Sequence, residues 1–159
     1  MHREVRIQTE DFVPDAEYQA LRRRSAGSAG AIATFVGLVR GVSGDADAGG
    51  LQALHLEHYP GMTERSIEAI VDRAAERWPL LDVVVVHRVG ALAPAAQIVY
   101  VQVASAHRAA AFAACEFIMD YLKTDAVLWK REDARGASRW IEATGDDRDR
   151  INAWDDAAR

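Results

Sequence analysis

The strand-like segments of this chain come in neighbouring pairs, and this pairing limits the folds that the chain can adopt. β-Branched and apolar residues dominate residues 81–89 and 97–104, which only a short connection separates. Residues 127–132 and 138–142 form a second such pair. Strands joined by short connections pair antiparallel, because a parallel crossover needs a dozen or more residues. The sequence therefore predicts the α+β class, with helices packed on a mostly antiparallel sheet.

Three segments have the features of helices. Residues 14–24 begin at Pro14, which suits the first turn of a helix. Residues 60–78 carry one apolar stripe at helical spacing, made of Ile67, Ile70, Val71 and Ala74. The longest helix is expected over residues 106–124. Further strands are expected at residues 3–9, 30–39 and 51–59. The predicted order is β-α-β-β-α-β-β-α-β-β. The strand at residues 30–39 is expected to be buried.

The length of 159 residues fits one domain with a full hydrophobic core. We expect a single catalytic α+β domain over residues 1–145 and a charged C-terminal tail over residues 146–159, where the apolar pattern is poor. Residues 41–50 are polar and rich in glycine, which predicts a mobile loop. A turn is expected around Gly136.

The charge and cysteine content exclude several classes of protein. A net charge of −5 argues against a nucleic-acid binder, which needs a basic surface to neutralise phosphates. Cys115 is the single cysteine, so the chain forms no internal disulfide and no CxxC metal site. Its apolar neighbours predict a buried thiol rather than a nucleophile. Because no segment has the apolar length of a secretion signal or a membrane span, we expect a soluble, cytoplasmic protein.

Basic residues occur at positions where they can bind an anion. Ser105 is a plausible N-cap for the longest helix, which would put His107 and Arg108 in its first turn. Unpaired backbone N–H groups and the helix dipole favour an anion there. Arg40 ends a predicted strand and can clamp a phosphate with two hydrogen bonds. On residue types alone, capping and solvated surface positions explain these side chains better than anion binding does.

Two lysines lie seven positions apart near the C-terminus. Lys123 ends the longest helix, where a cation suits the helix dipole, so a structural role alone would explain it. In the following strand, the alternation of side chains puts Lys130 and Glu132 on one face and Trp129 and Arg131 on the other. A lysine in a partly apolar pocket shifts its pKa readily and can then act chemically.

The sequence carries no signature of a metal or nucleotide site. The histidines at strand positions, His55, His58 and His87, have no partner at metal-ligand spacing, which favours core or surface roles. The glycine-rich phosphate-binding motifs and the serine nucleophile motif are absent. We therefore expect no metal and no resident cofactor.

Six segments match a known family in order along the chain. They are residues 30–40, 56–62, 87–90, 105–108, 117–124 and 129–132. Two of them read Ser105-Ala106-His107-Arg108 and Trp129-Lys130-Arg131-Glu132. These segments resemble the catalytic (large) subunit of molybdopterin synthase, from the molybdenum cofactor pathway. The resemblance extends from about residue 5 to residue 143.

The resemblance implies a sulfurtransferase. Members of this family take sulfur from the thiocarboxylated C-terminal Gly-Gly tail of a small ubiquitin-like partner subunit and convert cyclic pyranopterin monophosphate into the molybdopterin dithiolene. They form a heterotetramer built on a homodimer of large subunits. Lys123 and Lys130 match the catalytic lysines of the family. Its substrate-binding positions match Leu38, Val39, Arg40, His107, Arg108, Lys123, Lys130, Arg131 and Glu132. A thiocarboxylate and a phosphate are both anions, which explains a cationic pocket.

The spacing along the longest helix adds a prediction about assembly. His107 and Arg108 lie 15 to 16 positions before Lys123, about 22–24 Å along a helix. A pterin monophosphate is too short to contact both ends. One pocket that contains all these residues therefore requires His107 and Arg108 to come from a second subunit.

The chain departs from the family at two places. Val127 stands where many relatives have proline, which predicts a looser entry into the strand that follows. Ala95 and Ala96 replace a glycine-acid turn, which predicts a loop of different shape.

Two other functions fit parts of the sequence. A non-catalytic module that holds a phosphorylated ligand or a ubiquitin-like tail would need no lysine pair beside Arg40, His107 and Arg108. An RNA-binding domain conflicts with the acidic balance and lacks an aromatic stacking signature.

Overall fold

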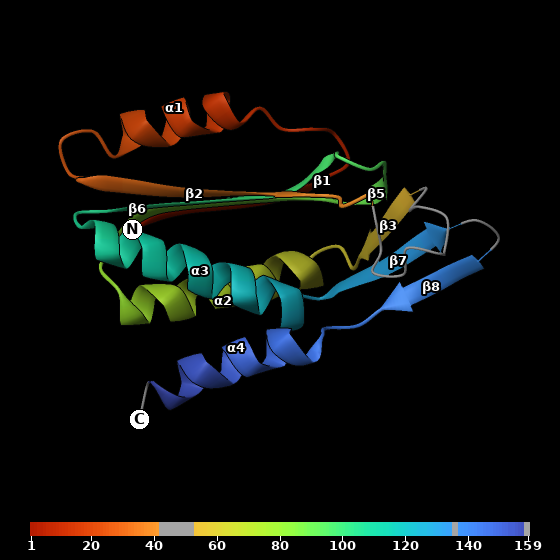
Figure 1. Ribbon diagram of the computed structural model, residues 1–159. Helices are drawn as coiled ribbons and strands as arrows, with labels where there is room; N and C mark the ends of the chain where they lie inside the picture. Colours follow the sequence, from red (N-terminus) through yellow and green to blue (C-terminus); the bar gives the residue numbers. More distant parts are fainter. Residues whose placement is uncertain (42–52, 135–136, 158–159) are drawn as a thin grey trace.

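Figure 1 shows the computed structural model, which describes residues 1–41, 53–134 and 137–157. Its elements are, in order, β1 (His2–Gln8), α1 (Pro14–Arg24), β2 (Ala31–Leu38), β3 (Ala53–His58), α2 (Met62–Arg77), β4 (Leu80–Arg88), β5 (Gly90–Leu92), β6 (Gln97–Ser105), α3 (Arg108–Thr124), β7 (Leu128–Ala134), β8 (Ala137–Ile141) and α4 (Gly145–Asp156). The strands form two four-stranded sheets. No helix in the described ranges is long and apolar enough to cross a membrane.

The first sheet has the strand order β1-β4-β6-β2. β1 pairs parallel with β4, whereas the other two strand pairs are antiparallel. α2 and α3 cover one face of this sheet and α1 covers the other (Figure 1). Because both faces are covered, β4 and β6 are almost wholly buried and lack the apolar–polar alternation of a half-exposed strand.

The second sheet has the order β5-β3-β7-β8 and is antiparallel throughout. It extends from one end of the first sheet, beyond the C-terminal end of α3 (Figure 1). Within β7, Lys130 lies opposite Leu56 of β3 and Ile141 of β8. A buried apolar cluster joins this sheet to the end of β2 and contains Val39, Leu54, Leu56, Val89 and Leu92. Lys130 is therefore held on a packed sheet rather than on a loop.

The predicted α+β class is confirmed, and the predicted element list needs three corrections. There are two sheets, because β3 and β7 pair with each other and not with the first sheet. A short extra strand, β5, lies in the connection after β4 and pairs with β3. A fourth helix, α4, lies in the tail, where the apolar pattern is poor because only Ile151 and Trp154 pack against the core.

The prediction that the strand at residues 30–39 is buried is wrong. β2 is an edge strand of the first sheet and pairs on one side only, with β6. Phe35 and Leu38 are 40% and 54% exposed. A β-branched, apolar run of this kind is typical of a buried strand, yet no described strand pairs with the outer edge of β2. The predicted loop at residues 41–50 and the turn at Gly136 lie outside the described residues, apart from Gly41.

The two departures from the family have different consequences. Entry into β7 is not loosened, because the backbone N–H of Val127 donates to the Ser66 hydroxyl (3.1 Å), a bond that proline cannot make. The Thr63 hydroxyl donates to the Val127 carbonyl (2.7 Å). Ala95 adopts a left-handed conformation with φ of 68°. Glycine suits that conformation better than alanine, so this turn carries some strain.

Candidate active site

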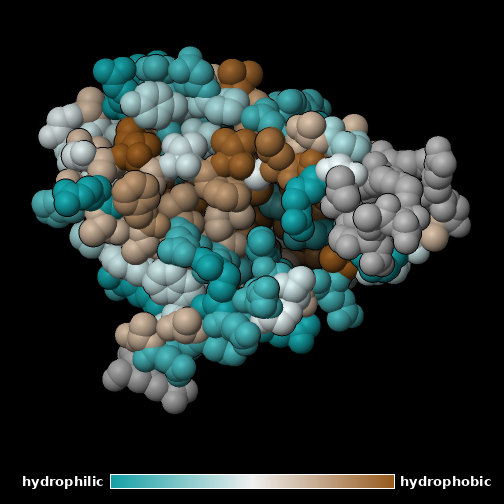
Figure 2. Space-filling model, in the orientation of Figure 1, coloured by the Kyte–Doolittle hydropathy of each residue, from teal (hydrophilic) through white to brown (hydrophobic). Residues whose placement is uncertain are grey.

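An open cavity of about 1350 Å³ lies where the two sheets meet α3 and α4. Its walls come from β2, the C-terminal half of α3, the strands β7 and β8, and the first turn of α4. Three exposed apolar side chains, Phe35, Leu38 and Phe112, lie on the β2 and α3 side. Figure 2 shows apolar side chains gathered on this face next to polar ones. The cavity can therefore hold a ligand with both charged and apolar parts.

The structure brings six of the nine predicted site residues to this cavity, and they come from three separate segments: the end of β2, the end of α3, and β7. The six are Leu38, Val39, Arg40, Lys123, Lys130 and Glu132. The other three, His107, Arg108 and Arg131, do not line it. Arg131 points to the opposite face of β7, where it pairs with Asp133 (3.4 Å) and lies over the Trp140 ring.

Lys123 and Lys130 are the only two lysines in the sequence, and both line the cavity. Lys123 lies in the last turn of α3 and its side chain is 54% exposed. Lys130 is partly buried on β7. Burial lowers the pKa of Lys130, the charge of Lys123 lowers it further, and the carboxylate of Asp147 partly opposes this change. Lys130 therefore gives up its proton more readily than an exposed lysine does.

Asp147, in the first turn of α4, accepts a hydrogen bond from the Lys123 ammonium (3.4 Å). Burial raises the pKa of Asp147, but hydrogen bonds from Thr144 and the contact with Lys123 outweigh burial, so the net change is downward. The carboxylate is ionised at neutral pH. Asp147 was not among the predicted site residues, although Thr144 and Asp147 have the spacing of a capping box, which indicates the start of a helix.

Arg40 and its neighbours are held by the turn that contains Ala95. The Val39 N–H donates to the Ala96 carbonyl (2.9 Å), and the Ala95 N–H donates to the Val39 carbonyl (2.8 Å). Val39 is 4% exposed, so it anchors this segment more than it offers surface. Leu38 and Arg40 on either side are exposed and line the cavity.

Glu132 lies on the same face of β7 as Lys130. Its carboxylate accepts a hydrogen bond from Arg139 of β8 (3.3 Å). The pair puts one negative and one positive charge at the rim of the cavity. Arg139 was not among the predicted site residues, because its position next to Glu132 depends on the pairing of β7 with β8.

His87 and Cys115 are buried close to the cavity. Burial lowers the pKa of His87 to about 4, and Lys130 acts in the same direction, so the imidazole is neutral at pH 7. Its Nδ1 lies 2.8 Å from the Arg88 carbonyl and donates to it in the corresponding tautomer. Burial raises the pKa of the Cys115 thiol to about 11. The interpretation of Cys115 as a buried thiol is confirmed.

His107 and Arg108 lie at the end of α3 far from Lys123 (Figure 1). The helix begins at Arg108, and its N-cap is His107 rather than Ser105. The prediction of Ser105 as N-cap is wrong because β6 continues through this residue, whose hydroxyl donates to the Pro79 carbonyl (2.8 Å). Both side chains are exposed. Within the described residues, no group of three or more His, Cys, Asp or Glu side chains could hold a metal ion.

Comparison with known families decides the classification. Residues 7–125 match the family model described as MoaE protein. This match covers well over half of the chain. The chain belongs to the MoaE family. The matched region includes Lys123 and ends before Lys130 and α4.

Relatives of this MoaE family member cover nearly its whole length. It is 53% identical to the molybdopterin synthase catalytic subunit of Vibrio cholerae, over 98% of this chain and 100% of that one. A solved structure of the molybdopterin biosynthesis MoaE protein from Burkholderia ambifaria is 47% identical, covers 97% of this chain and 98% of its own, and has a TM-score of 0.81. The structure of molybdopterin synthase from Staphylococcus aureus is 28% identical, with a TM-score of 0.76 over 86% of this chain and 95% of its own.

Proposed function

We propose that this chain is the large, catalytic subunit of a molybdopterin synthase, a sulfurtransferase of molybdenum cofactor biosynthesis. The observation that carries the proposal is the pair of lysines. In a chain with two lysines and many arginines, both lysines line one cavity, and one of them has a lowered pKa. The relatives at about half identity, named molybdopterin synthase catalytic subunit, support the same activity.

The proposed sulfur donor is the thiocarboxylated C-terminus of a small ubiquitin-like partner subunit, and the acceptor is cyclic pyranopterin monophosphate. The cavity is open enough to admit an extended peptide tail, and exposed Leu38, Phe112 and Trp129 offer apolar contacts at its edge. The assembly proposed from the family resemblance is a heterotetramer built on a homodimer of large subunits. We place this reaction in the cytoplasm, in keeping with a single buried cysteine thiol.

The residues of the cavity suit a reaction between two anions. Arg40, at the rim, is suited to the substrate phosphate because its guanidinium forms paired hydrogen bonds. Lys123, half exposed at the cavity mouth, is assigned to the thiocarboxylate. Lys130, more deeply buried, is assigned to substrate activation: it stabilises the charge that develops as sulfur bonds to the pterin side chain, and it can transfer a proton. Water then cleaves the acyl–sulfur bond and leaves the partner with an ordinary carboxylate.

His107 and Arg108 fit this scheme only if a second large subunit supplies them. α3 is unbroken from Arg108 to Thr124, so the two ends stay about 22–24 Å apart. In a dimer, the exposed His107 and Arg108 of one subunit would enter the cavity of the other and hold the substrate phosphate. Leu38, Val39 and Glu132 complete the proposed substrate-binding set. Arg131, on the opposite face of β7, is left out of it because its guanidinium contacts Asp133 and the Trp140 ring instead of the cavity.

Reconstitution tests the proposed function. The purified chain, its thiocarboxylated small partner and cyclic pyranopterin monophosphate are mixed, and mass spectrometry follows the dithiolene product. Product should form with the thiocarboxylated partner and should be absent when the partner carries an ordinary carboxylate. If the partner binds and no product forms, the chain is a binding module and not the synthase.

A further inference from the structure

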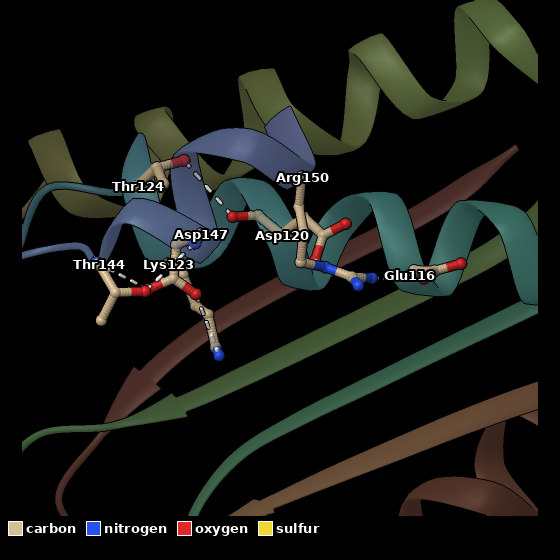
Figure 3. A network of polar contacts seen from close by, with 7 residues as sticks. All are labelled: Glu116, Asp120, Lys123, Thr124, Thr144, Asp147 and Arg150. Atoms are coloured by element: carbon tan, nitrogen blue, oxygen red, sulfur yellow. Dashed lines mark hydrogen bonds and ion pairs between the residues drawn. The ribbon is translucent and has the colours of Figure 1, made fainter. Parts of the chain in front are cut away.

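Helix α4 is docked firmly on α3, although it lies in the segment where the sequence pattern is poor. The carboxylate of Asp120, only 8% exposed, accepts hydrogen bonds from Arg150 (2.7 Å) and from the Trp154 indole N–H (2.8 Å). The Trp154 ring packs edge-on against Trp78 and Phe117. Figure 3 shows α4 lying along α3 with Arg150 between Asp120 and Glu116. This contact sets the position of the first turn of α4.

The first turn of α4 holds the carboxylate of Asp147 in a defined orientation. Oδ2 of Asp147 accepts hydrogen bonds from the Thr144 N–H (2.9 Å) and the Thr144 hydroxyl (2.7 Å). The Asp147 N–H donates in return to the Thr144 hydroxyl (3.2 Å). Thr144 is the N-cap residue of α4, and its hydrogen bonds occupy Oδ2 of Asp147. The other oxygen, Oδ1, is therefore left to accept a hydrogen bond from Lys123 (Figure 3). The side chain of Asp147 is 16% exposed, so it is well shielded from water.

Lys123 needs such a partner to have a defined position. It lies in the last turn of α3 with its side chain half exposed, and four rotatable bonds let an exposed lysine sample many rotamers. The one hydrogen bond of its ammonium to a described residue is the bond to Asp147.

We propose that Asp147 is a positioning residue, which holds the Lys123 ammonium at the cavity through its contact at 3.4 Å while Thr144 fixes its other oxygen. This inference rests on the proposed function and adds a residue to it, because Asp147 acts through Lys123 rather than on the substrate. The negative charge of this carboxylate also offsets the repulsion between the two ammonium groups that share the cavity. The consequence is that the C-terminal helix is part of the catalytic apparatus.

The charge balance around the lysines supports this role. Asp147 opposes the lowering of the Lys130 pKa that burial and Lys123 produce. The other charged or titratable groups that line the cavity or lie close to Lys130 are Arg40, His87, Cys115, Glu116, Asp120, Glu132, Arg139, Glu142, Asp146 and Arg150. Of the acidic groups, Asp120 and Glu116 are paired with Arg150 and Glu132 with Arg139. Among the described residues, Asp147 is the only carboxylate that forms an ion pair with a lysine.

Enzyme assays on the assembled synthase test the proposal with Asp147→Asn. Asparagine can still accept from Thr144, so the cap remains, but the charge that holds Lys123 is lost. A half-exposed ion pair is worth little, so kcat should fall about two- to fivefold with KM for the pterin little changed. The pH–rate limb that reports Lys130 should move to lower pH, because a negative charge that raised its pKa is gone.

Two further variants separate positioning from general loss of charge. Asp149→Asn removes the same charge from an exposed position on α4 that has no ion pair within the described part of the chain, and it should leave kcat and the pH profile unchanged. Asp147→Glu restores a carboxylate at a position where glutamate also completes a capping box, so it should recover part of the activity. Equal rates for Asp147→Asn and the wild type, or equal losses for Asp147→Asn and Asp149→Asn, would overturn the proposal.

NMR spectroscopy tests the contact between Lys123 and Asp147 independently of enzyme activity. Protein labelled with ¹³C and ¹⁵N in lysine alone gives signals from only two side chains, and Lys123→Arg assigns them. The Lys123 side-chain signals should shift and narrow toward those of free lysine in Asp147→Asn, but not in Asp149→Asn. If they do not shift, Asp147 does not position Lys123, whatever the assays give. If the wild type makes no product yet the signals shift, the contact stands and the proposed reaction fails.

Discussion

At the scale of single residues, the choice between lysine and arginine is informative. The chain has 17 arginines and two lysines, so nearly all of its positive charge comes from guanidinium groups. Arginine stays charged at any pH that a protein survives, whereas a buried lysine shifts its pKa readily. Lysine rather than arginine at positions 123 and 130 therefore indicates a role that positive charge alone does not explain. Such a role needs an amine that can exchange a proton or change its position.

Lys130→Arg tests this distinction. The variant keeps the positive charge on β7 but cannot transfer a proton. If Lys130 acts as an acid or base, kcat should fall about 100-fold or more while KM changes little. Steady-state kinetics of the reconstituted synthase measure both parameters. The matched control is Arg22→Lys, at an exposed position on α1 away from the cavity, which should leave both parameters unchanged. A rise in KM at constant kcat would mean that Lys130 only binds substrate.

His87 makes the stability depend on pH. Its pKa is about 4 in the folded protein, against an ordinary value of 6.5. Below pH 6.5 the unfolded chain binds a proton at this histidine, whereas the folded protein does not. The contribution of His87 to the free energy of unfolding is therefore complete above pH 6.5 and is lost as the pH falls toward 4. Urea unfolding should show that the wild type loses about 2 kcal/mol more than His87→Gln between about pH 7 and about pH 4.5. His58→Gln, at a partly exposed strand position, should behave like the wild type. Equal pH dependence for all three proteins would contradict the assignment to His87.

At the scale of elements, local patterns predicted most helices and strands well. The predicted helix at residues 14–24 has the observed bounds of α1, and the stripe that begins at Ile67 is buried in α2. The predictions failed at positions where contacts with a distant segment of the chain determine the local structure. Ser105 has the residue type of an N-cap, but β6 extends through it because it pairs with β2 and β4. α4 has few apolar residues, and its stability depends on polar contacts such as Arg150 with Asp120.

Gly30, just before β2, sets how closely this strand approaches the start of α3. A Cβ at Gly30 would lie 2.3 Å from the Ala106 carbonyl oxygen, and the Gly30 N–H donates to the Ser105 carbonyl (3.0 Å). Gly30→Ala should therefore destabilise the protein by about 1–3 kcal/mol in urea unfolding and displace the segment that carries His107. Gly145→Ala is the matched control, since a Cβ there meets no atom within 4 Å, and it should be neutral or slightly stabilising. Equal stability of the Gly30 and Gly145 variants would refute the steric argument.

At the scale of the whole molecule, the length of α3 connects the proposed mechanism to assembly. A helix that has Arg108 at one end and Lys123 at the other cannot contribute both ends to the same small cavity. A symmetric dimer would bring both ends together, because the start of α3 from one subunit would enter the cavity that the end of α3 lines in the other subunit.

Mixing inactive variants tests the shared site. In a heterodimer of an Arg108→Ala chain with a Lys123→Ala chain, one of the two cavities would have both residues intact. Random exchange of subunits should therefore restore about a quarter of wild-type activity. A mixture of Lys123→Ala with Lys130→Ala should stay inactive, because both lysines come from the same subunit. If exchange is demonstrated and the first mixture also stays inactive, the shared site is excluded.

The α+β class, three of the helices and the two lysines can be predicted from the amino-acid sequence, since they follow from periodicity over a few turns and from residue identity. Long-range packing determines the rest: β2 is an exposed edge, the strands divide into two sheets, and α4 docks on α3. The reason is physical: burial and pairing depend on which distant segment covers a given face. Lys123, Lys130 and Asp147 come from a helix, a strand and a second helix, and only packing brings their side chains to one cavity.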